Sequence, residues 1–150
     1  MTEIDPINDK ILRELAADGR LSNTELAARV GLSASACLRR VQDLEKRGII
    51  LGYRAVLDPV QTGRGFIAYL AVGLSDHSKT SQEDFERAMA RAPQVVECHN
   101  ITGTVEYLLR VEVADLAAYK TFHTDIVGQL AQVSSLTSYI VMGSPVNHRG

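Results

Sequence analysis

Two short helices joined by a tight turn are encoded between Ser22 and Lys46, and this unit constrains the fold more than any other stretch. Ser22 and Glu25 have the spacing of a capping box, which marks the start of a helix. Gly31 ends that helix because glycine adopts the left-handed backbone conformation at little cost. Ser33 is placed to cap the next helix almost immediately. The pattern predicts a helix-turn-helix.

A further helix precedes this pair. Asp5 is a candidate N-cap, Pro6 suits the first helical position, and Gly19 ends the helix. Its apolar residues recur on one face, at Ile7, Ile11, Leu12 and Leu15. Three such helices form the arrangement that places the last helix, here about Ser33 to Lys46, in the major groove of DNA.

The last helix has an apolar side and a basic side. Between residues 33 and 54, five basic side chains oppose two acidic ones, although the whole chain carries a net charge of −2. Small residues near its start permit close approach to bases, Arg39 can pair with guanine, and the later basic residues can reach phosphates. The predicted DNA-contacting residues are Ser33, Ser35, Ala36, Arg39, Arg40, Lys46 and Arg47.

A solvated helix face is the alternative for these arginines. Asp43 lies four residues from both Arg39 and Arg47, which is the spacing of ion pairs along a helix. The three-helix frame, the tight turn and the local positive charge favour DNA binding instead. Two other functions stay open: an architectural protein that coats DNA without an effector, and a module that senses a small molecule.

The chain changes its pattern near the middle. The apolar segment from Ile49 to Leu57 predicts a hairpin-like pair of strands, the wing of a winged helix-turn-helix. Asp58-Pro59, followed by two glycines, has the turn chemistry of a linker. We therefore predict two domains: residues 1–58, with the wing and a linker strand, and residues 59–150.

Strands and helices alternate in the second half in the order βαββαβ. The expected elements are a strand at 66–74, a helix from Ser81 to Pro93, strands at 95–102 and 106–113, a helix capped by Asp115, and a strand at 136–142. This order predicts a ferredoxin-like domain and an α+β fold class for the chain. The first strand is apolar on both faces, so we expect a second copy of the chain to cover the face without helices.

Several classes of function are not indicated. No apolar run is long enough to span a bilayer, and the N-terminus lacks an export signal. Cys37 and Cys98 form no metal-ligand or redox pair, and no catalytic motif is present. We therefore expect a cytoplasmic protein that is not an enzyme, with no cofactor, catalytic site, metal site or membrane partner.

Taken together, motifs along the whole chain resemble the Lrp/AsnC (feast/famine) family of transcriptional regulators. In the first half these are Ser22-Asn23-Thr24-Glu25-Leu26-Ala27, Val30-Gly31-Leu32-Ser33, Cys37-Leu38-Arg39-Arg40-Val41, Leu44 to Ile50 and Gly52-Tyr53. In the second half they are Glu97-Cys98-His99, Gly103, Glu106 to Val111 and Tyr139-Ile140-Val141-Met142.

The resemblance implies a regulator that binds specific double-stranded DNA and whose assembly or DNA affinity responds to a small effector. It implies an effector-binding and oligomerising second domain that forms dimers, often assembled into octamers, with an amino acid bound between subunits. It assigns effector contacts to Ile101, Thr102, Gly103, Thr104, Val105, Glu106, Tyr107, Leu136 and Ser138.

Two departures from the family pattern concern this site. Many members have Gly-Asp-x-Asp where this chain has Gly103-Thr104-Val105-Glu106, and some carry a threonine at the position of Leu136. Backbone amides at Gly103 can bind a carboxylate, and Glu106 can accept hydrogen bonds from an ammonium group. From the residues alone, Glu106 is equally compatible with a solvated residue at the end of a strand.

Overall fold

A computed structural model describes residues 4–147, so the ends of the two predicted domains, 1–3 and 148–150, lie outside the described residues. The chain divides between Ala55 and Val56 into two units. The predicted boundary at Asp58-Pro59 lies slightly further along the chain and stays a prediction. No helix within the described range is long and apolar enough to cross a membrane.

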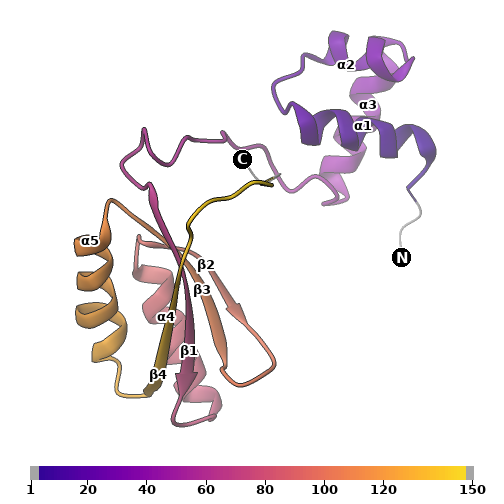
Figure 1. The fold of residues 1–150 in the computed structure, drawn as a ribbon. Coiled ribbons are helices and arrows are strands. Elements are labelled where there is room, and N and C mark those ends of the chain that lie inside the picture. The colour runs from indigo at the N-terminus through magenta and orange to yellow at the C-terminus, as the bar shows by residue number, and fades with distance from the viewer. Residues whose placement is uncertain (1–3, 148–150) are drawn as a thin grey trace. The chain divides into compact units, whose positions relative to one another are not determined.

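The first unit contains the three predicted helices, α1 (Pro6–Ala17), α2 (Asn23–Val30) and α3 (Ala34–Lys46), shown in indigo to magenta in Figure 1. Their N-caps are Asp5, Ser22 and Ser33, as predicted, and the Ser22 capping box is complete. The helices enclose a small core whose buried hydrophobic residues are Ile11, Leu26, Ala27, Val30, Cys37 and Leu44.

The predicted strand hairpin between Ile49 and Leu57 is wrong, because these residues form a turn followed by extended chain without strand pairing. The backbone N–H groups of Ile49 and Ile50 donate to the Leu44 carbonyl at 2.9 and 3.2 Å, and both side chains pack against the core. Ile49 and Ile50 therefore pack against the three-helix core at the end of α3 and do not belong to a strand. Beyond them Leu51 is 94% exposed, and no strand lies beside the segment within the described chain.

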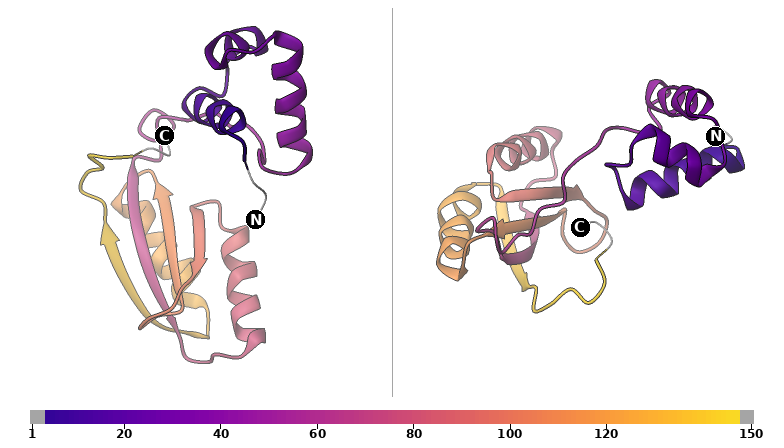
Figure 2. Two further views of the ribbon diagram at one scale, coloured as in Figure 1. Left: turned by 90° about the vertical axis from the view of Figure 1, so that its right-hand side faces the viewer. Right: turned by 90° about the horizontal axis from the view of Figure 1, so that it is seen from above.

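The second unit is a four-stranded antiparallel sheet with the order β2-β3-β1-β4. Helices α4 and α5 pack on one face and leave the other without a helix (Figure 2). The bounds are β1 Phe66–Leu74, α4 Lys79–Arg91, β2 Val95–Asn100, β3 Tyr107–Val113, α5 Leu116–Thr121 and β4 Val133–Ile140. A π-helical turn, Phe122–Ile126, and a 3₁₀ turn, Val127–Gln129, extend α5. The predicted βαββαβ order is confirmed.

Several element boundaries differ from the prediction. Strand β2 ends at Asn100 and not at Thr102, β3 begins at Tyr107 and not at Glu106, and β4 ends at Ile140 and not at Met142. The starts of α4 and β4 differ as well. Helix α4 begins at Lys79 and not at Ser81, because Ser78 is the N-cap and accepts the Ser81 N–H at 3.2 Å. Strand β4 begins at Val133, where polar residues interrupt the apolar run but still pair with β1 across a register shift near Gly73. The error at the start of α4 arises because the capping residue, Ser78, lies outside the apolar pattern. The error at the start of β4 arises because polar residues there, such as Ser135, pair with β1 through their backbone.

The larger core lies between the sheet and its helices. Ala68, Leu70 and Val72 of β1 face it, and the Phe85 and Tyr107 rings pack within it at a centroid distance of 4.7 Å. The alternate residues of β1 therefore lie on the helix-free face, on which residues 4–147 place no layer of secondary structure.

Candidate functional site

Helix α3 begins with a short polar and small-residue turn that is open to solvent. The Ser33 hydroxyl accepts the Ala36 N–H at 3.3 Å and lies 3.4 Å from the Ser35 hydroxyl. Ser35 is exposed and Ala36 is half-buried. Leu38 is 45% exposed, although the apolar pattern of the helix predicts that it lies on the buried side with Cys37 and Leu44. The start of α3 thus offers small side chains and one apolar side chain at the surface.

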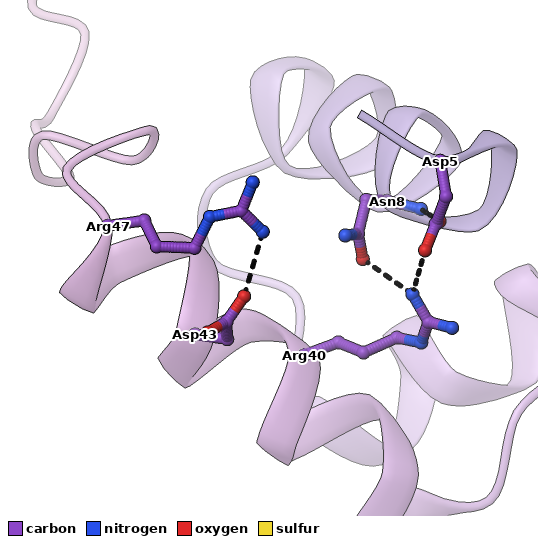
Figure 3. A network of polar contacts seen from close by, with 5 residues as sticks. All are labelled: Asp5, Asn8, Arg40, Asp43 and Arg47. Carbon is purple, nitrogen blue, oxygen red and sulfur yellow. Dashed lines mark hydrogen bonds and ion pairs between the residues drawn. The ribbon is translucent and has the colours of Figure 1, made fainter. Parts of the chain in front are cut away.

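The basic residues of α3 fall into two groups. The side chains of Arg39 and Lys46 make no hydrogen bond or ion pair with any residue between 4 and 147, and both are exposed. Arg47 donates from Nη1 to Asp43 Oδ2 at 2.9 Å, four positions away (Figure 3). Of the two partners that the spacing allowed for Asp43, the structure pairs it with Arg47. Arg39 therefore keeps all its donors for an external partner.

Arg40 is bound to the start of α1 (Figure 3). Its Nη1 donates to Asp5 Oδ2 at 2.6 Å and to Asn8 Oδ1 at 3.0 Å. The hydrogen bond from Arg40, followed by that from the Asn8 backbone, lowers the pKa of the Asp5 carboxyl. No local pattern indicates this contact, because 35 positions separate the two charged residues. The phosphate contact predicted for Arg40 stays a prediction.

Two further side chains donate hydrogen bonds to α3. Asn23 of α2 donates from Nδ2 to the Ala34 carbonyl at 2.7 Å, which ties the two helices together across the turn. Tyr53 donates from its hydroxyl to Glu45 Oε1 at 2.9 Å, and burial and this contact raise the Tyr53 pKa. Sequence reasoning missed both positions, because each contact joins residues that belong to different elements.

The predicted effector loop closes the hairpin between β2 and β3. The Ile101 N–H donates to the Glu106 carbonyl at 2.9 Å. Thr102, Gly103 and Thr104 between them are exposed, whereas Val105 is half-buried. Gly103 has a φ of 135°, which L side chains rarely adopt, so the turn needs glycine at this position. The backbone of the loop is thus accessible to a ligand.

Glu106 joins this loop to the end of β1. Its Oε2 accepts the Leu74 N–H at 2.6 Å, and its backbone N–H donates to the Val72 carbonyl at 3.1 Å. Its Oε1 lies 3.2 Å from His77 Nδ1. The carboxylate is 21% exposed, so it is neither a solvated strand end nor a wholly free acceptor. Glu106 has a structural role that the sequence pattern did not predict.

The remaining predicted effector residues lie on the helix side of the sheet. Tyr107 is 1% exposed and donates to Glu86 of α4 at 2.7 Å, and burial followed by this contact raises its pKa to about 12. The Ser138 hydroxyl lies 2.7 Å from the Tyr119 hydroxyl of α5, and Leu136 packs against the core. Within one chain, these residues are engaged with the helices.

The helix-free face carries a compact group of paired polar side chains. Arg110 Nη2 lies 2.9 Å from Glu112 Oε1, and the Arg110 guanidinium carbon lies 6.0 Å from the centre of the Tyr69 ring. Both charged side chains are less than one fifth exposed. Across β1, Tyr69 pairs with Tyr139 of β4, which is 58% exposed. Aromatic rings and neutralised charges make this face suitable for contact with another protein surface.

Comparison with known proteins connects these features. The family model described as the Lrp/AsnC ligand binding domain matches residues 67–150. The chain belongs to the Lrp/AsnC family. A model described as winged helix-turn-helix DNA-binding matches residues 4–50, so the predicted winged helix-turn-helix class is confirmed even though the paired strands are not formed. This Lrp/AsnC chain therefore combines a DNA-binding domain with a ligand-binding domain.

Relatives of this Lrp/AsnC chain match it over nearly its full length. It is 39% identical to the proline dehydrogenase transcriptional activator of Rhizobium radiobacter, over 95% of this chain and 91% of the relative. It is 36% identical to the leucine-responsive regulatory protein of Escherichia coli, over 93% and 85%. A solved L-Met complex of a transcriptional regulator from Neisseria meningitidis is 34% identical, with a TM-score of 0.93 over 97% and 94% of the two chains.

Proposed function

We propose that the protein binds specific DNA sequences through α3 and that an amino acid bound by its second unit changes its DNA affinity or its assembly. The observation that carries the DNA-binding part is the exposed pair Arg39 and Lys46, neither of which has a partner within residues 4–147. Basic side chains on a helix that follows a tight turn are placed to enter the major groove.

The DNA contacts divide by chemistry. Arg39 donates to the acceptors of a guanine edge, and Ser35 and Ala36 allow the helix to approach the bases closely. Lys46 and Arg47 contact phosphates, which sets affinity and its salt dependence. Ser33 caps α3 and places the small residues at the groove.

The effector part rests on the ligand-binding family model and on the exposed loop from Ile101 to Glu106. Amide groups near Gly103 bind the effector carboxylate. Glu106 retains acceptor capacity beside its bonds to Leu74 and His77, because a carboxylate has about four lone-pair sites. An amino acid is the supported class because relatives are named leucine-responsive or were solved with L-Met.

Self-association is the third part of the proposal. The helix-free face, with Tyr69, Arg110 and Tyr139, meets the same face of a second copy, as in an isologous dimer. Dimers then assemble further, to octamers. We infer that the protein acts in the cytoplasm, where the DNA is, and that it is a binding protein and not an enzyme, since its family comprises transcriptional regulators.

The experiment that tests the DNA and effector parts uses the full chain. Duplexes are selected from a random library with the protein at physiological salt, and the twenty amino acids are screened by thermal shift. We expect one family of duplexes to be enriched and at least one amino acid to raise the melting temperature, because a ligand that binds only the folded state stabilises it. Enrichment of no sequence would indicate a DNA-coating protein instead.

Glu106→Ala tests the effector site against a matched control. The variant should lose the thermal shift produced by the amino acid while keeping affinity for the selected duplex. Glu83→Ala is the control, because it removes an exposed carboxylate of the same unit that pairs with Lys79 along α4. Unchanged amino-acid binding to Glu106→Ala in calorimetry would rule out the assigned role.

Tyr139→Arg tests the dimer surface. Placed on the helix-free face, the new charge should convert dimers to monomers in sedimentation velocity. Leu116→Arg is the control, since Leu116 is 62% exposed on α5, on the opposite side of the sheet. Dimers that survive Tyr139→Arg but not Leu116→Arg would place the interface on the helices.

A further inference from the structure

We propose that Arg40 is a positioning residue, which fixes the rotation of α3 against the first turn of α1 through Asp5 and does not contact DNA phosphates. The inference rests on the proposed DNA-binding function, because it explains how the base-contacting residues of α3 are oriented. It concerns three residues that lie together in the first unit: Asp5, Asn8 and Arg40 (Figure 3).

Asp5 uses its two oxygens for two different tasks. Oδ1 accepts the Asn8 N–H at 2.7 Å, which caps α1. Oδ2 accepts from Arg40 Nη1 at 2.6 Å, which joins α3 to the same cap. Asn8 closes the group, because its side-chain oxygen also accepts from Arg40 and the residue is only 6% exposed. Asp5, which caps α1, thus also binds α3 through Arg40.

The Asp5–Arg40 contact adds a directional link between α1 and α3 to the apolar packing of α3 and to the Asn23 contact from α2. Cys37 and Leu44 hold α3 against the core through apolar packing, which is not directional. Hydrogen bonds from a guanidinium to a carboxylate have a defined geometry. Because Arg39 and Arg40 are consecutive on α3, fixing the direction of Arg40 also fixes the direction in which Arg39 leaves the helix.

Electrostatics argue against a phosphate contact by Arg40. A phosphate that approached its guanidinium would also approach the Asp5 carboxylate, which lies 2.6 Å away and is itself 47% exposed. The attraction of one charge is then offset by the repulsion of the other. Arg39 and Lys46 have no acidic neighbour in contact within the described residues. Arg47 keeps its proposed phosphate contact because a phosphate has to displace only Asp43 there, whereas Arg40 is held by both Asp5 and Asn8.

Arg47 provides the matched comparison. It also pairs with an aspartate, at 2.9 Å, but Asp43 belongs to α3 itself. That ion pair lies along one helix and cannot orient it relative to α1. Asp5→Asn and Asp43→Asn therefore each remove one carboxylate beside an arginine of α3, and only Asp5→Asn breaks a link between helices. Asparagine caps helices about as well as aspartate, so the cap of α1 is kept.

The test measures binding of full-length variants to two duplexes across a range of salt concentrations. One duplex is selected from a random library by the wild-type protein, and the other has the same bases in shuffled order. Asp5→Asn and Arg40→Ala should weaken binding to the selected duplex by about 10- to 150-fold, the equivalent of losing one hydrogen bond to a charged group. The shuffled duplex and the slope of log K against log salt should be unaffected.

Asp43→Asn should keep the preference between the two duplexes. The proposal is overturned if Asp5→Asn tightens binding to both duplexes, which would mean that Arg40 had been released to a phosphate. It is also overturned if Arg40→Ala reduces the salt slope by about one, the signature of a lost phosphate contact. If Arg40→Ala does not fold, Asp5→Asn carries the test.

A second measurement separates this inference from the proposed function. Amide hydrogen exchange of α3 should be faster in Asp5→Asn than in Asp43→Asn, with no DNA present. If the wild-type protein selects no duplex, sequence-specific binding fails and the exchange result still decides whether Arg40 links the helices. Equal exchange of α3 in the two variants would overturn the link itself.

Discussion

The two units are held together by different means. Within the described residues, the core of the first unit has six buried hydrophobic residues, and that of the second has fourteen. The first unit adds three helix N-caps, one of them in a capping box, and ion pairs such as Asp5–Arg40. The second adds two N-caps on α4 and α5, ion pairs and the pairing of four strands. A small unit thus depends on polar contacts at helix ends for a larger share of its stability than a large one.

The two units also differ in whether the polar side chains at their surfaces are paired. In the first unit, Arg39 and Lys46 are left without protein partners among residues 4–147. In the second, Glu106, Arg110 and Tyr107 are all engaged by other groups of the chain. A surface for DNA needs unsatisfied donors, whereas a surface for another subunit tolerates charges that are already neutralised.

Phe85→Ala should produce the largest effect, confined to the second unit. Phe85 is fully buried against Tyr107, and its truncation should cost about 3–5 kcal/mol of unfolding free energy. Amide hydrogen exchange with mass spectrometry measures this separately for each unit. Leu116→Ala, at an exposed position of the same unit, should change little. Equal loss of protection in α1 to α3 would contradict the division into two units.

Arg39→Ala should come next and affect DNA binding alone. Losing a base contact should weaken binding to the selected duplex by about 1–3 kcal/mol and relax the base preference at one position. Arg13→Ala is the control, because Arg13 is an exposed arginine of α1 that pairs with Asp9. Anisotropy titrations give the affinities. An equal loss on every sequence would instead assign Arg39 to a phosphate.

Ser22→Ala and Ser78→Ala remove one N-cap from each unit and so test the comparison directly. Each should cost about 1 kcal/mol, since the lost hydrogen bond is the same. We expect exchange protection to collapse further in the first unit, because its smaller core leaves less stability in reserve. A larger collapse around α4 would reverse the comparison.

Acidification should give the smallest effect, and mainly in the first unit. In the first unit, contacts with Arg40 and Ser22 lower the pKa of Asp5 and Glu25. In the second, contact with Ser78 lowers the pKa of Asp76. A lowered pKa contributes stability above the unfolded-state value, and this contribution is lost as pH falls through the folded-state value. Melting temperatures should therefore decline more steeply below about pH 4 in the wild type than in Asp5→Asn. Parallel curves would show that the Asp5 carboxylate adds nothing.

Local signals were sufficient for most of the helices. Asp5, Ser22, Ser33 and Asp115 each lie within three residues of the amide they cap, so a short stretch of sequence contains both partners. The sequence did not indicate Ser78 as the N-cap of α4, because Ser81 and Asp84 have the spacing of a capping pair three residues further along the chain. The βαββαβ order along the chain also followed from local alternation and turn residues.

Contacts between distant segments could not be predicted. Asp5 and Arg40 are 35 positions apart, and Glu106 reaches the backbone of Leu74 across 32. Aspartate, arginine and glutamate are usually exposed to solvent, so their positions in the sequence do not show which of them make such distant contacts. The hairpin predicted between Ile49 and Leu57 was wrong for a related reason. Strand pairing depends on a partner strand, which an apolar segment does not specify by itself.

Cys37 lies at the centre of the three-helix core with 0% exposure, and burial raises the pKa of its thiol. A thiol reagent in solution can reach it only when the helices separate. The rate at which Cys37 is labelled, followed on the peptide that contains it, therefore measures how often the DNA-binding unit opens. Bound DNA that stabilises the closed unit should lower this labelling rate.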